Sequence, residues 1–127
     1  MTARISARAS RIAAQMQRAL AELLSRGEVK DPRVGNVTIT SVVLPSDLSV
    51  ARVHFLPFAG THSAAEALEG LRSAAGFLRG ELARDLKLRY APRLEFELDT
   101  ELLRAQQLTE LIDSAVKADR THPPDES

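Results

Sequence analysis

The chain has no cysteine and no tryptophan among its 127 residues. The absence of cysteine excludes a disulfide scaffold, a thiolate metal site and a cysteine nucleophile, and it is compatible with a reducing cytosol. No apolar run approaches the ~20 residues that a membrane span needs. The basic N-terminus is not followed by an apolar block of signal-peptide length. We therefore expect neither a membrane span nor a secretory signal, and we expect a cytoplasmic protein.

The chain also lacks net charge, because 17 basic residues balance 17 acidic ones. This balance hides two unlike parts: residues 1–93 hold 14 basic and 8 acidic residues, whereas residues 94–127 hold 3 basic and 9 acidic ones. Such asymmetry hints at a nucleic-acid surface beside an acidic tail. On charge alone, chance segregation on solvated faces stays the simpler interpretation, because a pI near neutral lacks the usual signature of a nucleic-acid binder.

Length and ordinary composition indicate one globular domain with a single core. Apolar residues at spacings of three and four predict a first helix over residues 4–26. Two alternating runs rich in β-branched residues, at 37–44 and 49–56, predict an antiparallel hairpin around a turn at 45–48. A third strand is expected at 93–99, which makes a three-stranded sheet.

A second helical segment begins at residues 61–66 and carries a leucine-rich stripe. Gly76 and Gly80 lie inside it, and an interior glycine costs ~1 kcal/mol relative to alanine. We therefore expect a kink, or a close approach by another molecule, at this point. If so, Gly76→Ala should not stabilise the fold.

A last helix is predicted over about 101–118, capped by Thr100. Its apolar side chains are expected to pack inward: Leu103, Leu108, Leu111, Ile112 and Ala115. The element order predicts an α+β fold whose helices cover one face of the sheet. We expect a single domain over residues 1–119 and a disordered polar tail over 120–127.

Basic side chains follow two helical faces. On the first helix, no acidic residue interrupts an arginine stripe before Glu22; on the second, cations and small residues lie opposite the leucine stripe. Small residues beside cations suit a phosphate backbone that approaches the main chain closely, although a solvated face with an accidental glycine is the alternative. The candidate RNA-binding residues are Arg4, Arg8, Arg11, Arg18, Arg72, Arg79, Arg84, Lys87 and Arg89.

Other chemistry finds little support. The histidines have no metal-ligand spacing, and no segment supplies a nucleophile, a base and an oxyanion hole together. We expect no enzyme, no metal site and no cofactor. Only Phe58, Phe77 and Tyr90 are candidates for base stacking, so we expect RNA binding through backbone and shape rather than base reading.

Several blocks, in the same order and spacing, resemble the bacterial ribosome-binding factor A family. They cover most of residues 4–116. The blocks are KDPR at 30–33, VTIT at 37–40, SDLSVARV at 46–53, ALEGL at 67–71, AAGFLR at 74–79 and LRYAPRLEFELD at 88–99.

The resemblance implies a type II KH fold of order α-β-β-α-α-β, followed by a C-terminal helix. KH domains clamp RNA with a GXXG loop, whereas this family has an Ala-x-Gly kink there, matched by Ala74, Ala75 and Gly76. It implies a non-enzymatic assembly factor that binds the free 30S subunit and 16S rRNA, aids late maturation of the rRNA 5′ end and supports growth in the cold.

The resemblance also implies a functional link to a small-subunit-dependent GTPase, and we expect a monomer. The acidic C-terminal part departs from a basic RNA binder. The alternative function is a small α+β protein-interaction or regulatory domain without RNA binding, whose arginine stripes merely keep it soluble. Salt dependence separates the two, because an RNA complex with several phosphate contacts weakens steeply as salt rises.

Overall fold

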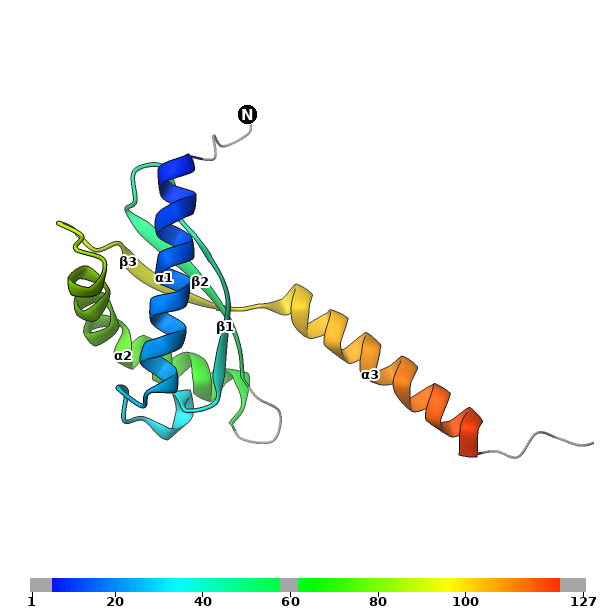
Figure 1. The fold of residues 1–127 in the computed structure, drawn as a ribbon. Coiled ribbons are helices and arrows are strands. Elements are labelled where there is room, and N and C mark those ends of the chain that lie inside the picture. The colour runs from blue at the N-terminus through cyan, green and yellow to red at the C-terminus, as the bar shows by residue number, and fades with distance from the viewer. Residues whose placement is uncertain (1–5, 58–61, 122–127) are drawn as a thin grey trace, which may run out of the picture.

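The computed structural model describes residues 6–57 and 62–121 (Figure 1). The elements, in chain order, are helix α1 (Ala7–Ser25), a single 3-10 turn η1 (Pro32–Val34), strands β1 (Val37–Val43) and β2 (Val50–Pro57), helix α2 (Ala64–Asp85), strand β3 (Arg93–Leu98) and helix α3 (Thr100–Thr121). The predicted α+β class and element order are therefore confirmed. None of the helices in this described part is long and apolar enough to cross a membrane.

The three strands form one sheet with β2 in the centre. β1 pairs antiparallel with β2, which confirms the predicted hairpin, whereas β3 runs parallel to β2. Alternation along β2 buries Ala51, Val53 and Phe55 completely on one face. Arg52 and His54 lie on the opposite, more open face, although Leu56 at the end of the strand is buried.

Both α1 and α2 pack on the apolar face of the sheet. Met16 and Leu20 of α1 and Leu71 and Leu78 of α2 are fully buried and share one cluster with Phe55. Burying a leucine or phenylalanine side chain contributes roughly 1.5–3 kcal/mol, so this cluster dominates the stability of the domain. The polar faces of both helices are thereby directed outward.

β1 is an edge strand with an irregular register. A bulge interrupts its pairing with β2 between Ile39 and Ser41. At this bulge the Gln17 side-chain amide donates a 3.2 Å hydrogen bond to the Thr40 carbonyl. The Thr40 hydroxyl donates to the Asp99 carboxylate at 2.6 Å, so the bulge also connects β1 to the start of α3.

η1 packs tightly against α2 at Gly70. A Cβ atom on Gly70 would lie 2.9 Å from Val34 Cγ1 and 3.0 Å from Arg33 Cβ. These separations are too short for carbon atoms, so any side chain at this position forces η1 to shift. Sequence reasoning missed this close approach.

Asp31 and Arg33 hold η1 in shape. The Asp31 carboxylate accepts the Arg33 backbone N–H at 3.0 Å and the Arg33 guanidinium at 2.7 Å. The guanidinium hydrogen bond is the main cause that lowers the pKa of Asp31 from 3.8 to about 2. η1 therefore begins with an ionised N-cap.

This cap gives a prediction about pH. Because the pKa of Asp31 is lower in the folded chain than in the unfolded one, ionised Asp31 stabilises the fold above a pH of about 4, and this contribution is lost as the pH falls toward about 2. We expect Asp31→Asn, which keeps the cap acceptor, to lower the melting temperature at neutral pH. Thermal melts should show the difference from the wild type shrinking between about pH 4 and pH 2; a constant difference would contradict the assignment.

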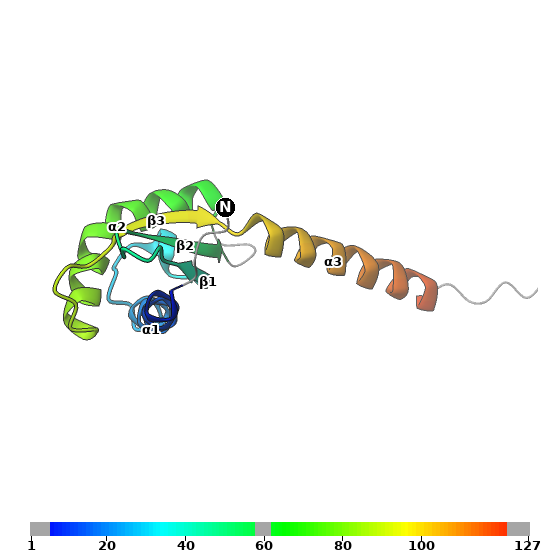
Figure 2. The same cartoon turned by 90° about the horizontal axis from the view of Figure 1, so that it is seen from above.

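α2 is one continuous helix rather than two. Ser63 and Glu66 begin it with reciprocal hydrogen bonds of 3.1 and 3.2 Å, as the segment at 61–66 predicts. Figure 2 shows that the helix changes direction partway along its length, so a bend takes the place of a break.

α3 forms as predicted, but it extends away from the rest of the molecule (Figures 1 and 2). The predicted inward packing is wrong: Leu108, Leu111 and Ile112 are 59%, 68% and 55% exposed, Ala115 is exposed, and Leu103 is only half-buried. Helical periodicity shows which side chains share a face, but it does not show whether anything covers that face.

The ends of α3 also differ from the prediction. The cap is Asp99 rather than Thr100, because the Asp99 carboxylate accepts the Leu102 N–H at 3.0 Å. The helix continues through Thr121, so residues 120 and 121 of the expected tail are helical. Residues 122–127 of that tail lie outside the described residues.

Candidate nucleic-acid interface

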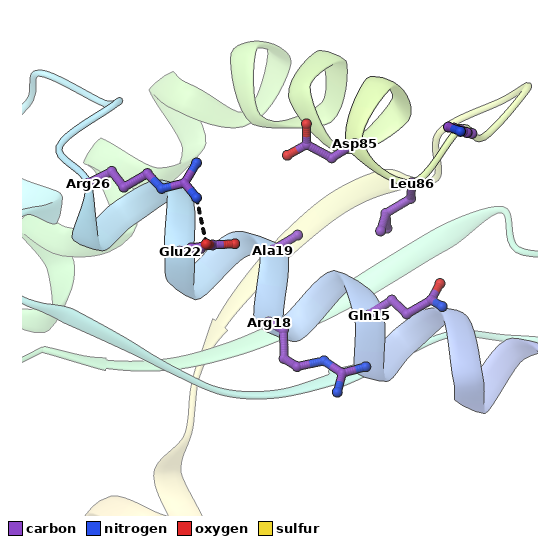
Figure 3. Close-up of a pocket in the computed structure, with 8 residues that line it drawn as sticks. Gln15, Arg18, Ala19, Glu22, Arg26, Asp85 and Leu86 are labelled. Carbon is purple, nitrogen blue, oxygen red and sulfur yellow. Dashed lines mark hydrogen bonds and ion pairs between the residues drawn. The ribbon is translucent and has the colours of Figure 1, made fainter.

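α1 and the end of α2 border an open hollow of about 660 Å³ (Figure 3). Three of its lining side chains are cations: Arg18 and Arg26 from α1, and Lys87 from just beyond α2. The remaining lining residues are Gln15, Ala19, Glu22, Asp85 and Leu86. The hollow therefore brings together one candidate residue from each basic face, Arg18 and Lys87.

The three cations of the hollow differ in their partners. Arg26 forms an ion pair with Glu22 at 2.5 Å, and Figure 3 shows Arg18 pointing away from this pair. Within the described residues, neither the Arg18 nor the Lys87 side chain has a hydrogen-bonding or ionic partner. Both are exposed, so both can receive an anion from outside the chain.

The end of α2 fixes the position of Lys87. Its backbone is in the left-handed region, with φ of 52°. The following residue, Leu88, donates its N–H to the Ala83 carbonyl at 2.9 Å, and Lys87 donates its own to the Arg84 carbonyl at 3.3 Å. A cation here also interacts favourably with the negative end of the helix dipole.

Two other predicted RNA-binding residues have partners within the protein. The Arg79 guanidinium donates two hydrogen bonds, of 3.0 and 2.9 Å, to the Ala91 carbonyl. Arg84 forms an ion pair with Glu81. Arg79 therefore also has a structural role, since it fastens the loop between α2 and β3 to the helix.

The structure separates the remaining candidates. Arg8, Arg11 and Arg89 are exposed and lie outside the lining of the hollow. Arg72 lies in a different hollow, of about 300 Å³, beside Glu95 and Glu97. Arg4 lies outside the described residues.

Sequence reasoning missed Arg26, because Glu22 seemed to end the arginine stripe. The signal was the spacing of four from Arg18 to Glu22 and of four again to Arg26, which keeps all three on one helical face. The Glu22–Arg26 pair then leaves Arg18 as the unpaired cation of α1 in this hollow.

The kink residues and the nearby glycine differ in exposure. Ala74 is buried and Ala75 half-buried, whereas Gly76 and Gly80 are exposed. A Cβ on either glycine would meet nothing within 4 Å. The absence of side chains at Gly76 and Gly80 therefore does not serve internal packing, and it leaves the helix backbone open to an approaching molecule.

This geometry reverses one expectation. With open space and no left-handed backbone at Gly76, we expect Gly76→Ala to raise the free energy of unfolding by about 0.5–1 kcal/mol, because alanine is the better helix former. Chemical denaturation measures the change, and Gly80→Ala should behave alike. A loss of stability would instead show that the bend needs glycine.

A polar row crosses the open face of the sheet. The Ser41 hydroxyl lies 3.0 Å from His54 Nδ1, and His54 Nε2 lies 3.4 Å from the Glu97 carboxylate. The row thus links the three strands. Across residues 6–57 and 62–121, no group of three or more histidine, aspartate or glutamate side chains is placed to hold a metal ion.

Fold and surface together define a KH-like α+β domain in which one hollow is lined by cations from α1 and from the end of α2. The model of the family "Ribosome-binding factor A" matches residues 8–112. The chain belongs to the ribosome-binding factor A family, which confirms the resemblance seen in its sequence.

Relatives and solved structures agree with this assignment. The chain is 45% identical over 119 residues to ribosome-binding factor A of Thiobacillus denitrificans, with 94% of this chain and 95% of that protein covered. It is 48% identical over 119 residues to that of Pseudomonas fluorescens, with 91% and 89% covered.

Two Thermus thermophilus structures share the fold. The crystal structure of the ribosome-binding factor A of this organism is 36% identical, with a TM-score of 0.62 over 71% of this chain and 94% of that one. A homology model of the Thermus factor, fitted into a cryo-electron microscopy map of its complex with the 30S subunit, is 36% identical, with a TM-score of 0.59 over 70% and 92%. These similarities confirm the predicted KH-like fold.

Proposed function

We propose that this chain is a non-enzymatic assembly factor that binds the free 30S subunit through 16S rRNA and assists late maturation of the 5′ end of that RNA. One observation carries the proposal: Arg18 of α1 and Lys87 at the end of α2 line one open hollow, and neither side chain has a protein partner among the described residues. The Thermus relative fitted into the map of a 30S complex supports the choice of partner.

The RNA contacts follow from the chemistry of the surface. Arg18 and Lys87 bind phosphate oxygens, arginine with its planar fork and lysine as a compact charge. The exposed backbone at Gly76 and Gly80 lets a neighbouring strand approach α2 closely. Arg8, Arg11 and Arg89 extend the positive potential beyond the hollow, Arg84 binds RNA in competition with its ion pair to Glu81, and Arg79 positions the adjoining loop.

The acidic C-terminal part contributes to orientation. Residues 94–127 hold 9 acidic and 3 basic residues, so RNA is repelled from this part and attracted to the basic helical faces. Such opposed potentials steer association and suppress incorrect docking more than they raise affinity.

Membership of the family supports the wider biology that we propose. The chain acts as a cytoplasmic monomer, its release from the subunit is promoted by a small-subunit-dependent GTPase, and its function matters most for growth in the cold.

Sedimentation with separated 30S, 50S and 70S particles tests the partner. We expect the chain to sediment with 30S subunits at moderate salt, and the affinity to fall steeply as salt rises, because each phosphate contact releases counterions. Equal recovery with 50S particles would contradict the proposal. Binding to 30S that is insensitive to salt would favour the alternative, a protein-interaction domain.

A further inference from the structure

The loop between α2 and β3 carries an aromatic ring that the domain does not use. Tyr90 is 82% exposed, more than any other large hydrophobic side chain in the described residues. The Arg89 guanidinium lies over one face of its ring, with the central carbon 5.9 Å from the ring centroid. One face of the ring therefore stays open to a partner.

Several contacts hold this loop in place. Arg79 donates two hydrogen bonds to the Ala91 carbonyl, next to Tyr90. Pro92 is buried, and the Arg93 N–H donates to the Ser49 carbonyl at 3.0 Å. A ring presented from a fixed backbone loses little conformational freedom when it binds.

Two cations precede the ring in the chain. Arg89 precedes it, and Lys87, three residues before it, lines the hollow between α1 and α2. An exposed aromatic ring near cations is the combination with which proteins hold unpaired nucleotides: the ring stacks on the base and the cations bind the phosphates. A duplex cannot use this ring, because its bases are already stacked.

We propose that Tyr90 stacks on an unpaired base of the RNA, next to the phosphates bound at Arg18 and Lys87. The inference rests on the proposed function and deepens it: the RNA segment bound here contains a single-stranded or extruded nucleotide. It selects Tyr90 from the three stacking candidates of the sequence and adds one base contact to a surface expected to bind mainly through backbone and shape.

The chain provides its own probe for this contact. Tyr90 is its only tyrosine and it has no tryptophan, so the intrinsic fluorescence comes from this ring, and stacking on a base quenches it. We expect single-stranded RNA of about ten nucleotides, within the usual site size of such surfaces, to quench the emission, and the same sequence in a duplex to leave it largely unchanged. Equal quenching by both, or none by the single strand, would overturn the inference.

Two substitutions at the same position test the contact on the subunit. Tyr90→Leu keeps an apolar side chain without a ring, and we expect it to weaken 30S binding roughly 5- to 150-fold, the range that corresponds to one stacked base. Tyr90→Phe keeps the ring and should bind as the wild type does. Because Tyr90 is exposed, both variants should melt as the wild type does.

The outcomes separate the two proposals. If the wild type binds 30S and Tyr90→Leu binds equally well, the stacking contact is absent while the proposed function stands. If Tyr90→Phe is as weak as Tyr90→Leu, the hydroxyl group and not the ring makes the contact, and the inference fails. If the wild type itself does not bind 30S, the proposed function fails.

Discussion

Replacing Arg18 and Lys87 together by glutamate is expected to weaken binding to the 30S subunit by roughly 100-fold or more at moderate salt. Each charge-assisted hydrogen bond to a phosphate contributes about 1.5–3 kcal/mol, and the loss of two corresponds to at least that change in affinity. The fold should survive, because both side chains are exposed and have no partner among the described residues. Arg79 is less suitable for this test, because it also fastens Ala91.

The salt dependence provides a second readout. If both side chains bind phosphates, the slope of log affinity against log salt should become shallower by about two in the double variant. Lys30→Glu with Arg104→Glu is the matched control, since it changes the net charge equally at two exposed positions outside the hollow. Should the control weaken binding as much, net charge rather than this surface would govern the affinity.

Gly70→Ala is expected to lower the free energy of unfolding by about 1–3 kcal/mol, the range for overpacking a well-packed site. The added Cβ would lie 2.9 Å from Val34 Cγ1 and 3.0 Å from Arg33 Cβ. This repulsion outweighs the ~1 kcal/mol by which alanine favours a helix over glycine. Chemical denaturation should therefore give opposite signs for Gly70→Ala and Gly76→Ala.

A double-mutant cycle identifies the source of the loss. Val34→Ala removes the methyl group that the new Cβ would meet, although it costs stability itself because Val34 is 1% exposed. We expect the double variant with Gly70→Ala to be less destabilised than the two single variants added together. Strict additivity would show that the contact with Val34 is not what excludes a side chain at position 70.

The hairpin and the first helix could be predicted because their patterns are local. Alternation in 37–44 and 49–56 places Val53 and Phe55 on one face, and the structure buries both completely. The parallel pairing of β3 with β2 was beyond this reasoning, since it depends on how α2 returns the chain across the sheet.

The glycines show where pattern reasoning failed. The sequence predicted a kink or a close approach at Gly76 and Gly80, which interrupt a helix. The glycine at which packing leaves no room for a side chain is Gly70. The position of Gly70 around the helix axis could have indicated this, because Gly70 lies beside the buried stripe of Leu71 and Leu78. The other two glycines are exposed. The identity of the facing element, η1, could not be read from the helix itself.

The candidate site was predictable in its parts but not in its assembly. Arg18 and Lys87 are 69 residues apart in the sequence, and only the packing of α1 against the end of α2 brings them to one hollow. The packing of α2 against β3 leaves Arg72 beside Glu95 and Glu97, although helical phase groups Arg72 with Lys87.

The irregular edge of the sheet has a consequence for solubility. An unpaired edge strand is a template on which a second chain can add a strand, and proteins commonly prevent this with bulges and covering side chains. β1 has both devices: the bulge between Ile39 and Ser41, and the Gln17 amide bonded to the Thr40 carbonyl. The edge of the sheet is thereby protected against pairing with a second chain, and Gln17 contributes to this protection because it occupies a carbonyl group of the edge strand.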